Sequence, residues 1–114
     1  MTINQLQQRI RSFRDERNWM QFHNHKDMAI ALSIEAAELQ ELFLWKKGNE
    51  IEEVVNLKKA QITEEVADIA VYLFELADNL GIDIASAIEN KLQKNAQKYP
   101  VEKARGSSKK YNEL

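Results

Sequence analysis

The sequence predicts an all-α fold, a four-helix arrangement of the bundle type. Its 114 residues include only 3 Gly and 1 Pro, while 44% are apolar and 30% are charged. This composition favours long elements with short connections. Apolar side chains recur at helical spacing, and no segment shows the alternation of a strand. The length favours one domain, which we expect to cover residues 1–114.

Four helices are predicted from the periodicity and from the residues that end each segment. They cover residues 3–18, 26–47, 58–80 and 83–98. The aromatic segment 19–25 breaks the helical period and is predicted as a loop. Gly48 is expected to cap the end of the second helix, and residues 49–57 are expected to be a connection with one helical turn. Residues 98–114 are predicted to form a basic, partly irregular tail.

Composition excludes several classes of protein. The chain has no cysteine, which excludes a disulfide framework, a zinc–thiolate site and a thiol nucleophile. Its net charge of −2 argues against a nucleic-acid partner. No apolar run approaches the roughly 20 residues that span a bilayer, and the first residues do not resemble a signal peptide. We therefore expect a cytoplasmic protein without a membrane partner.

Carboxylates interrupt the apolar stripes of two predicted helices. Glu35 lies in the middle of the stripe of helix 26–47, and Glu38 lies at its edge one turn later. Glu65 and Asp68 repeat the arrangement on helix 58–80. Residues three apart share a helix face, so four acids are expected to point into the bundle. Burying unpaired carboxylates is costly, so the pattern indicates either a divalent ion bound by oxygen ligands, Mg²⁺ or Mn²⁺, or a buried ion-pair network.

Polar groups of the opposite sign follow on the last helix. Lys91, Asn95 and Lys98 continue its apolar stripe at helical spacing, where they would either contact phosphate oxygens or extend into solvent. The tail adds further cations and hydroxyl groups. Flat side chains gather in loop 19–25 and at Trp45, where stacking on a nucleobase and ordinary core packing are both open.

At this point the sequence resembles the MazG-like nucleotide pyrophosphohydrolases, and it is most similar to their small dCTP pyrophosphatase branch. The family motif is ExxE followed by ExxD, here Glu35 and Glu38, then 26 residues, then Glu65 and Asp68. The segments that carry the resemblance are residues 16–23, 38–46, 64–73, 91–100 and 104–111. Together they extend over nearly the whole chain.

The resemblance implies a function and a set of site residues. The activity would be the hydrolysis of a nucleoside triphosphate, dCTP or a modified pyrimidine nucleotide, to monophosphate and pyrophosphate. The implied metal ligands are Glu35, Glu38, Glu65 and Asp68. The implied phosphate ligands are Lys91, Asn95, Lys98, Arg105, Ser108 and Lys109. The implied base and sugar pocket contains Trp19, Phe22, His23, Trp45 and Tyr72.

Two further expectations, one departure from the family pattern and the alternatives complete the hypothesis. Glu38 is nominated as the general base that activates water, and relatives suggest a homodimer or homotetramer. Some relatives carry Arg where this chain has Lys98, and Lys lacks the bidentate fork of Arg. The alternatives are a related phosphohydrolase acting on dUTP or phosphoribosyl-ATP, and a non-catalytic helical module that would be indifferent to Mg²⁺.

Overall fold

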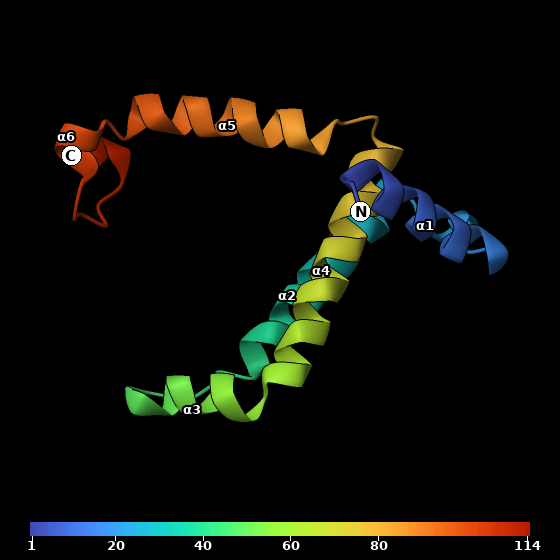
Figure 1. Ribbon diagram of the computed structural model, residues 1–114, viewed down its shortest axis with the longest axis horizontal. Coiled ribbons are helices and arrows are strands. Elements are labelled where there is room, and N and C mark those ends of the chain that lie inside the picture. The colour runs from blue at the N-terminus through green and yellow to red at the C-terminus, as the bar shows by residue number, and fades with distance from the viewer. The chain divides into compact units, whose positions relative to one another are not determined.

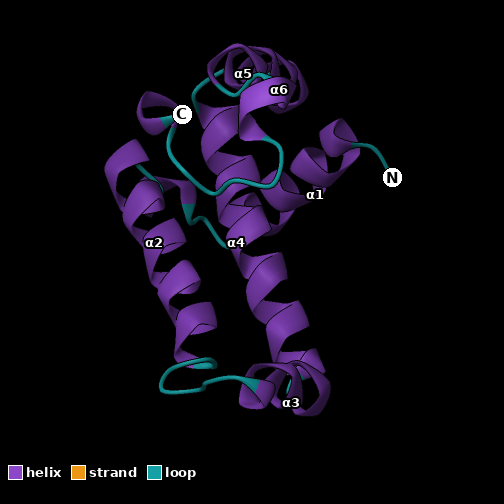
Figure 2. Cartoon of the chain, turned by 90° about the vertical axis from the view of Figure 1, so that its left-hand side faces the viewer, coloured by secondary structure: helices purple, strands orange, loops and turns teal.

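The computed structural model describes residues 1–114 and contains helices, turns and loops but no strand (Figure 2). The elements are α1 (Ile3–Glu16), a 3₁₀ turn (Met20–Phe22), α2 (His25–Glu41), α3 (Asn49–Leu57), α4 (Lys59–Asn79), α5 (Ile84–Lys98), α6 (Val101–Ala104) and a 3₁₀ turn (Tyr111–Glu113). The predicted all-α class is confirmed. The chain divides into two compact units, residues 1–81 and 82–114. No helix combines the length and the apolar character that crossing a membrane requires.

Helices α2 and α4 form the centre of the first unit. They run antiparallel and lie side by side (Figures 1 and 2). Apolar side chains three and four residues apart share one face of a helix, and the predicted stripes do lie on the less exposed faces. On α2, Met28 is buried and Leu39 is half-buried. On α4, Ile62 and Ile69 are half-buried.

Helix α1 packs on α4 through polar side chains. Thr2 begins α1 with a capping box, in which its side chain accepts from the backbone N–H of Gln5 and its own N–H donates to the Gln5 side chain. The residues buried on α1 are Gln7 and Arg14. Gln7 Nε2 donates to the carbonyl oxygen of Phe74 at 3.0 Å. Among the apolar side chains of α1, Ile3 and Ile10 are half-buried, while Phe13 stays 52% exposed.

The predicted end of the second helix is wrong. Helix α2 ends at Glu41, and the next residues form tighter turns with bonds such as Phe43 N to Gln40 O at 2.9 Å, a common way to end a helix. Trp45 then takes a φ of 65°. Gly48, predicted as a C-cap, instead precedes α3 with a φ of 53°, a backbone region that suits glycine. The predicted connection is therefore largely helix α3.

The second unit consists of α5 followed by a folded tail. Asp83 caps α5 by accepting from the backbone N–H of Ser86 at 3.0 Å, and the helix ends before Pro100, as predicted. The tail contains two short helical elements. Tyr111 lies edge-on to Tyr99 with ring centroids 6.2 Å apart, and the Lys98 ammonium lies 5.0 Å from the centroid of the Tyr111 ring. The predicted irregular tail is thus anchored to the end of α5.

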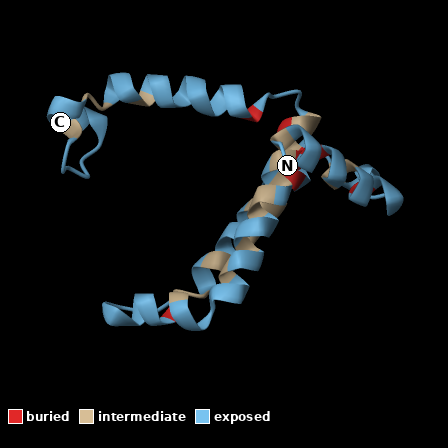
Figure 3. Ribbon diagram, viewed as in Figure 1, coloured by how far each residue is buried: buried red, intermediate tan, exposed pale blue.

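Few apolar side chains are fully buried (Figure 3). The buried ones are Met28, Val54 and Ala77 in the first unit and Ile84 in the second. Several large apolar residues on the central helices stay open, among them Ile30 at 49% and Ile34 at 53% on α2, and Val66 at 52% on α4. The helices therefore present apolar surface beyond the predicted stripes.

Candidate metal and nucleotide site

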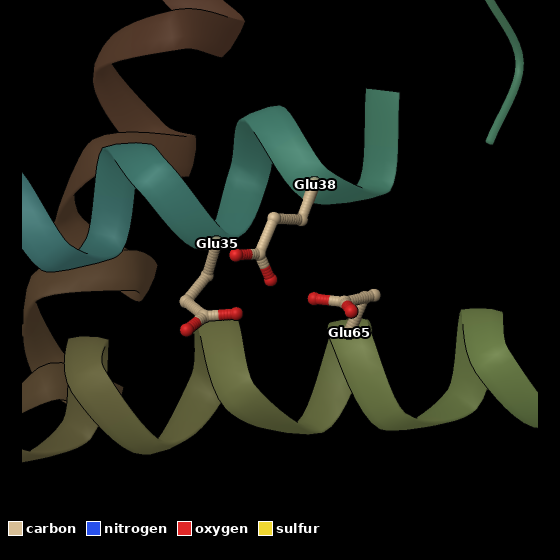
Figure 4. A group of neighbouring side chains, drawn as sticks. All are labelled: Glu35, Glu38 and Glu65. Atoms are coloured by element: carbon tan, nitrogen blue, oxygen red, sulfur yellow. The ribbon is translucent and has the colours of Figure 1, made fainter. Parts of the chain in front are cut away.

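Three carboxylates meet between α2 and α4. Glu35 and Glu38 are one turn apart on α2, so they share a face, and Glu65 faces them from α4 (Figure 4). One oxygen of each side chain lies within 4.8 Å of the others. The structure therefore brings together three of the four predicted metal ligands. We call Glu35, Glu38 and Glu65 the acid cluster.

No basic side chain compensates the acid cluster. None of its members forms an ion pair within 4.0 Å, and the ion pairs of the chain lie elsewhere. Lys46 and Lys58, which lie at either end of the connection between the two central helices, line a different small pocket beside α3. The oxygens Glu35 Oε2 and Glu65 Oε2 are enclosed and have no hydrogen-bond partner. A buried ion-pair network is therefore absent from this site.

Repulsion and burial change the acidity of the cluster. Burial, followed by the neighbouring carboxylate of Glu38, raises the pKa of Glu35 from 4.5 to about 7. Burial is also the main cause that raises the pKa of Glu65. The charge of Asp68 contributes in the same direction to both. In the absence of a cation, the site therefore favours retaining a proton.

The donor set fits a hard divalent ion. Enclosed carboxylate oxygens without partners are the atoms that such an ion would satisfy, and ligands made only of oxygen suit Mg²⁺ or Mn²⁺ rather than zinc. Asp68 is outside the cluster. It lies one turn after Glu65 on α4 and borders the adjoining pocket together with Glu35.

A pocket of about 280 Å³ adjoins the acid cluster. It is lined by Ile10, Phe13, Arg14, Trp19, His23, Glu35, Asp68, Val71, Tyr72 and Glu75. This volume is just below the roughly 300–1,000 Å³ of ligand pockets, so it suits part of a nucleotide. A larger, open hollow of about 760 Å³ lies along α1 alone and contains none of the acid cluster.

The pocket contains part of the predicted aromatic set. Trp19, His23 and Tyr72 line it. The rings of Trp19 and His23 are 6.2 Å apart. Burial and then the charge of Glu35 raise the pKa of the Tyr72 hydroxyl, so it stays protonated. Phe22 and Trp45 do not line this pocket, and they are 61% and 83% exposed.

Sequence reasoning missed two charged residues of this pocket, Glu75 and Arg14. Glu75 is 3% exposed. Its Oε2 lies 2.8 Å from His23 Nδ1 and accepts from Asn79 Nδ2 at 3.2 Å, and Arg14 Nη1 lies 3.7 Å away. A signal was available, because positions 65, 68, 72 and 75 follow one face of α4 at helical spacing.

The predicted phosphate ligands belong to the second unit. Lys91, Asn95 and Lys98 recur at helical spacing on α5, where Asn95 is half-buried and both lysines are exposed. The tail candidates Arg105, Ser108 and Lys109 are exposed. Ser107 Oγ accepts from the backbone N–H of Lys109 at 3.2 Å, which forms a local turn.

Comparison with known proteins identifies the family. A model of the MazG-like family matches residues 30–114, a range that contains the whole acid cluster. The chain belongs to the MazG-like family. Two similar relatives are named dCTP pyrophosphatase 1, from Mus musculus and Homo sapiens. Each is 36% identical over 115 residues, which cover 99% of this chain and 68% of the relative.

A solved structure agrees with the fold of this MazG-like chain. It is a pyrophosphatase from Archaeoglobus fulgidus with a TM-score of 0.83 and 40% sequence identity, covering 85% of this chain and 91% of that one. The predicted family and enzyme class, a nucleotide pyrophosphohydrolase, are therefore confirmed. Family membership indicates a metal-dependent enzyme, and the acid cluster is the candidate for its ion.

Proposed function

We propose that this MazG-like chain hydrolyses dCTP, or a pyrimidine deoxynucleoside triphosphate with a modified base, to the monophosphate and pyrophosphate. The proposed ion is Mg²⁺, with Mn²⁺ as the alternative. The observation that carries the proposal is the pair of enclosed, unpartnered oxygens of Glu35 and Glu65 beside an aromatic pocket. The names of the similar relatives support the substrate. Such an enzyme would remove unwanted nucleotides from the cytoplasmic pool.

Four carboxylates would hold the ion: Glu35, Glu38 and Glu65 of the acid cluster, together with Asp68. When bound, a divalent ion neutralises the triphosphate and the charge that develops on the leaving pyrophosphate. The carboxylates themselves fix the ion between two helices. The raised pKa of Glu35 implies that binding expels a proton.

Glu38 would act as the general base. It would accept a proton from a water molecule while the water oxygen forms a bond to the α-phosphorus. The bond between this phosphorus and the oxygen bridging to the β-phosphorus then breaks, and pyrophosphate leaves. Glu38 is favoured because the enclosed oxygens belong to Glu35 and Glu65, which leaves Glu38 free to face a ligand.

Cationic and polar side chains of α5 and the tail would bind the phosphates. Lys91, Asn95 and Lys98 present two ammonium groups and an amide along α5. The tail residues Arg105, Ser108 and Lys109 would add a guanidinium, a hydroxyl and a third ammonium group. Charge-assisted hydrogen bonds of this kind are the usual way to hold phosphate oxygens.

The base would enter the pocket beside the acid cluster, where Trp19, His23 and Tyr72 would contact it. Phe22 and Trp45 do not line this pocket, and they would reach the base from another copy of the chain. We therefore propose a homodimer or homotetramer. Its support is the 83% exposure of Trp45 and the open apolar side chains Ile30, Ile34 and Val66.

A nucleotide panel tests the reaction. The purified chain with Mg²⁺ is given each nucleoside triphosphate, dUTP and phosphoribosyl-ATP included, and the release of pyrophosphate and orthophosphate is measured. We expect pyrophosphate as the first product, with dCTP or a modified form preferred. Glu38→Gln should bind nucleotide and lose turnover. Orthophosphate as the first product would refute the proposal. Turnover that stays unchanged when the divalent ion is removed by a chelator would also refute it.

A mixing experiment tests the shared pocket. Chains carrying Glu38→Gln and chains carrying Trp45→Ala are each purified, mixed, unfolded and refolded together. In mixed oligomers one site combines an intact Glu38 with an intact Trp45 from the other chain, so activity should return. Sedimentation as a monomer, or no recovery of activity in confirmed mixed oligomers, would exclude a base pocket shared between copies.

A further inference from the structure

Glu75 forms the charged wall of the pocket beside the acid cluster. It is 3% exposed and lines the same pocket as Glu35 and Asp68. Its Oε2 is occupied, because His23 and Asn79 both bond to it. A buried carboxylate needs such partners, and here they also fix the side chain in one orientation.

The second oxygen of Glu75, Oε1, is different. It accepts no hydrogen bond within the chain, whereas Oε2 accepts two. Oε1 is also not one of the enclosed oxygens without a partner, which are those of Glu35 and Glu65. It therefore retains access to the space that the pocket offers. An ionised carboxylate oxygen can only accept hydrogen bonds. Glu75 Oε1 therefore favours a ligand group that donates a hydrogen bond.

We propose that Glu75 determines base specificity by accepting a hydrogen bond from the 4-amino group of a cytosine base through Oε1. The inference rests on the proposed function, because it assumes that the pocket receives the base of a nucleotide. Uracil and thymine have a carbonyl oxygen at this position. That oxygen would face Glu75 Oε1 as a second acceptor, and both groups would lose their hydrogen bonds to water.

Neighbouring groups strengthen this selection. His23 donates through Nδ1 to Glu75 when that nitrogen carries the proton, which leaves Nε2 as an acceptor in the neutral ring. Arg14, the nearest cation, is occupied by Asp15 at 2.8 Å and by Asn79 at 3.2 Å. Arg14 is 7% exposed, so little of it is open to a carbonyl ligand.

The competing role for Glu75 is structural. The same carboxylate helps to hold α1 and the loop that carries His23 against α4. A substitution could then weaken activity on every nucleotide without changing the preference between bases. The ratio of two substrates separates the roles, because a structural defect affects both substrates and cancels in the ratio.

The test compares the full-length chain with Glu75→Gln. Affinities for dCMP and dUMP are measured by calorimetry, and kcat/KM is measured for dCTP and dUTP with Mg²⁺. A hydrogen bond to a buried charged group corresponds to roughly 10- to 100-fold in affinity, so we expect at least a tenfold preference for cytosine in the parent. Glutamine presents a donor as well as an acceptor, so the variant should discriminate by about twofold or less.

Asp78→Asn is the matched control. Asp78 lies one turn after Glu75 on α4 and pairs with Arg11 at 2.6 Å, but it does not line the pocket. This variant removes the same charge and one of the contacts of α1, and it should keep the parental preference. A parallel loss of preference in Asp78→Asn would show that packing of α1 sets the specificity and would overturn the proposal.

A second measurement needs no variant. The parent chain is given a dCMP analogue whose 4-amino group carries two methyl groups and therefore has no N–H donor. Its affinity should fall to the level of dUMP or below. Equal binding of dCMP and dUMP by the parent, or an unchanged preference in folded Glu75→Gln, would overturn the role of Glu75. Base-selective binding without hydrolysis would instead refute the proposed function and leave this role intact.

Discussion

Replacing Glu35 with glutamine should change stability in opposite directions with and without a divalent ion. Glu35 has an enclosed oxygen without a partner, and its carboxylate faces two others within 4.8 Å. Without an ion at pH 8, most Glu35 side chains are charged, since burial and Glu38 raise the pKa only to about 7. Glutamine removes that charge and can donate a hydrogen bond to Glu38 or Glu65.

The expected magnitude follows from the distance between the carboxylates. Two unit charges 4.8 Å apart repel by about 0.9 kcal/mol in water and by about 3.5 kcal/mol at an effective dielectric constant of 20. The cluster is only half-buried, so solvent screening favours the lower value. We expect Glu35→Gln to stabilise the metal-free chain by about 1 kcal/mol. For a domain of this size that corresponds to roughly 4 °C in Tm.

A bound divalent ion should reverse which of the two proteins, the parent or Glu35→Gln, has the higher Tm. An ion at 100 times its Kd stabilises the parent by about 2.7 kcal/mol, or roughly 11 °C. The variant lacks one charged ligand, so its response should be much smaller. The parent should therefore melt below the variant in EDTA and above it in Mg²⁺ or Mn²⁺.

Thermal denaturation followed by circular dichroism at pH 8, once in EDTA and once with the divalent ion, checks both predicted differences in Tm. Glu64→Gln is the control, since it removes an exposed acid of α4 outside the cluster and should leave the metal response unchanged. If Glu35→Gln destabilises the metal-free chain, the repulsion is not present. If the variant and the parent gain equally from the ion, Glu35 is not a ligand.

Three further predictions follow from the same structure. Because Glu35 has its pKa raised from 4.5 to about 7, the stability due to its bound proton is present below pH 4.5 and lost as pH rises through about 7; urea titrations in EDTA should show a steeper decline for the parent than for Glu35→Gln. Met28→Ala should cost about 2–5 kcal/mol, because Met28 is 1% exposed; a cost no larger than that of Ile30→Ala on the same helix would contradict this. Trp45→Gly should stabilise the isolated chain by about 0.5–1 kcal/mol, because Trp45 has a φ of 65°; a lower Tm at concentrations that give monomer would show that the indole is packed.

Periodicity was sufficient to predict α1, α4, α5 and most of α2, and with them the acid cluster. Residues 35 and 38, and then 65 and 68, share helix faces whatever the tertiary structure is. Two such faces that also carry apolar residues must meet, because each buries its stripe against the other. That geometry places Glu65 opposite Glu35 and Glu38, as the structure shows.

The errors came from features that have no periodic signature. The end of α2 depends on turns around residues 42–45 and on the conformation of Gly48, and the spacing of apolar residues says little about either. The buried polar residues of α1 were missed for a related reason. The spacing of its apolar residues includes Ile3 and Ile10, which are half-buried, but it does not reveal the buried Gln7 and Arg14, because their partners lie more than 60 residues away.

The polar contacts of α1 determine its position along α4. Apolar side chains slide over one another at small cost, whereas Gln7, Arg11 and Arg14 each bond to a specific atom of α4 or of its end. A displacement of α1 by one residue would break all three bonds together. The helix and the aromatic loop that follows it therefore have a single register against the carboxylates of α4. Replacing Gln7, Arg11 and Arg14 with apolar residues would keep α1 attached but would let it shift along α4. Trp19 and His23 would then no longer hold a fixed position opposite Glu35 and Glu75 in the pocket that these residues line.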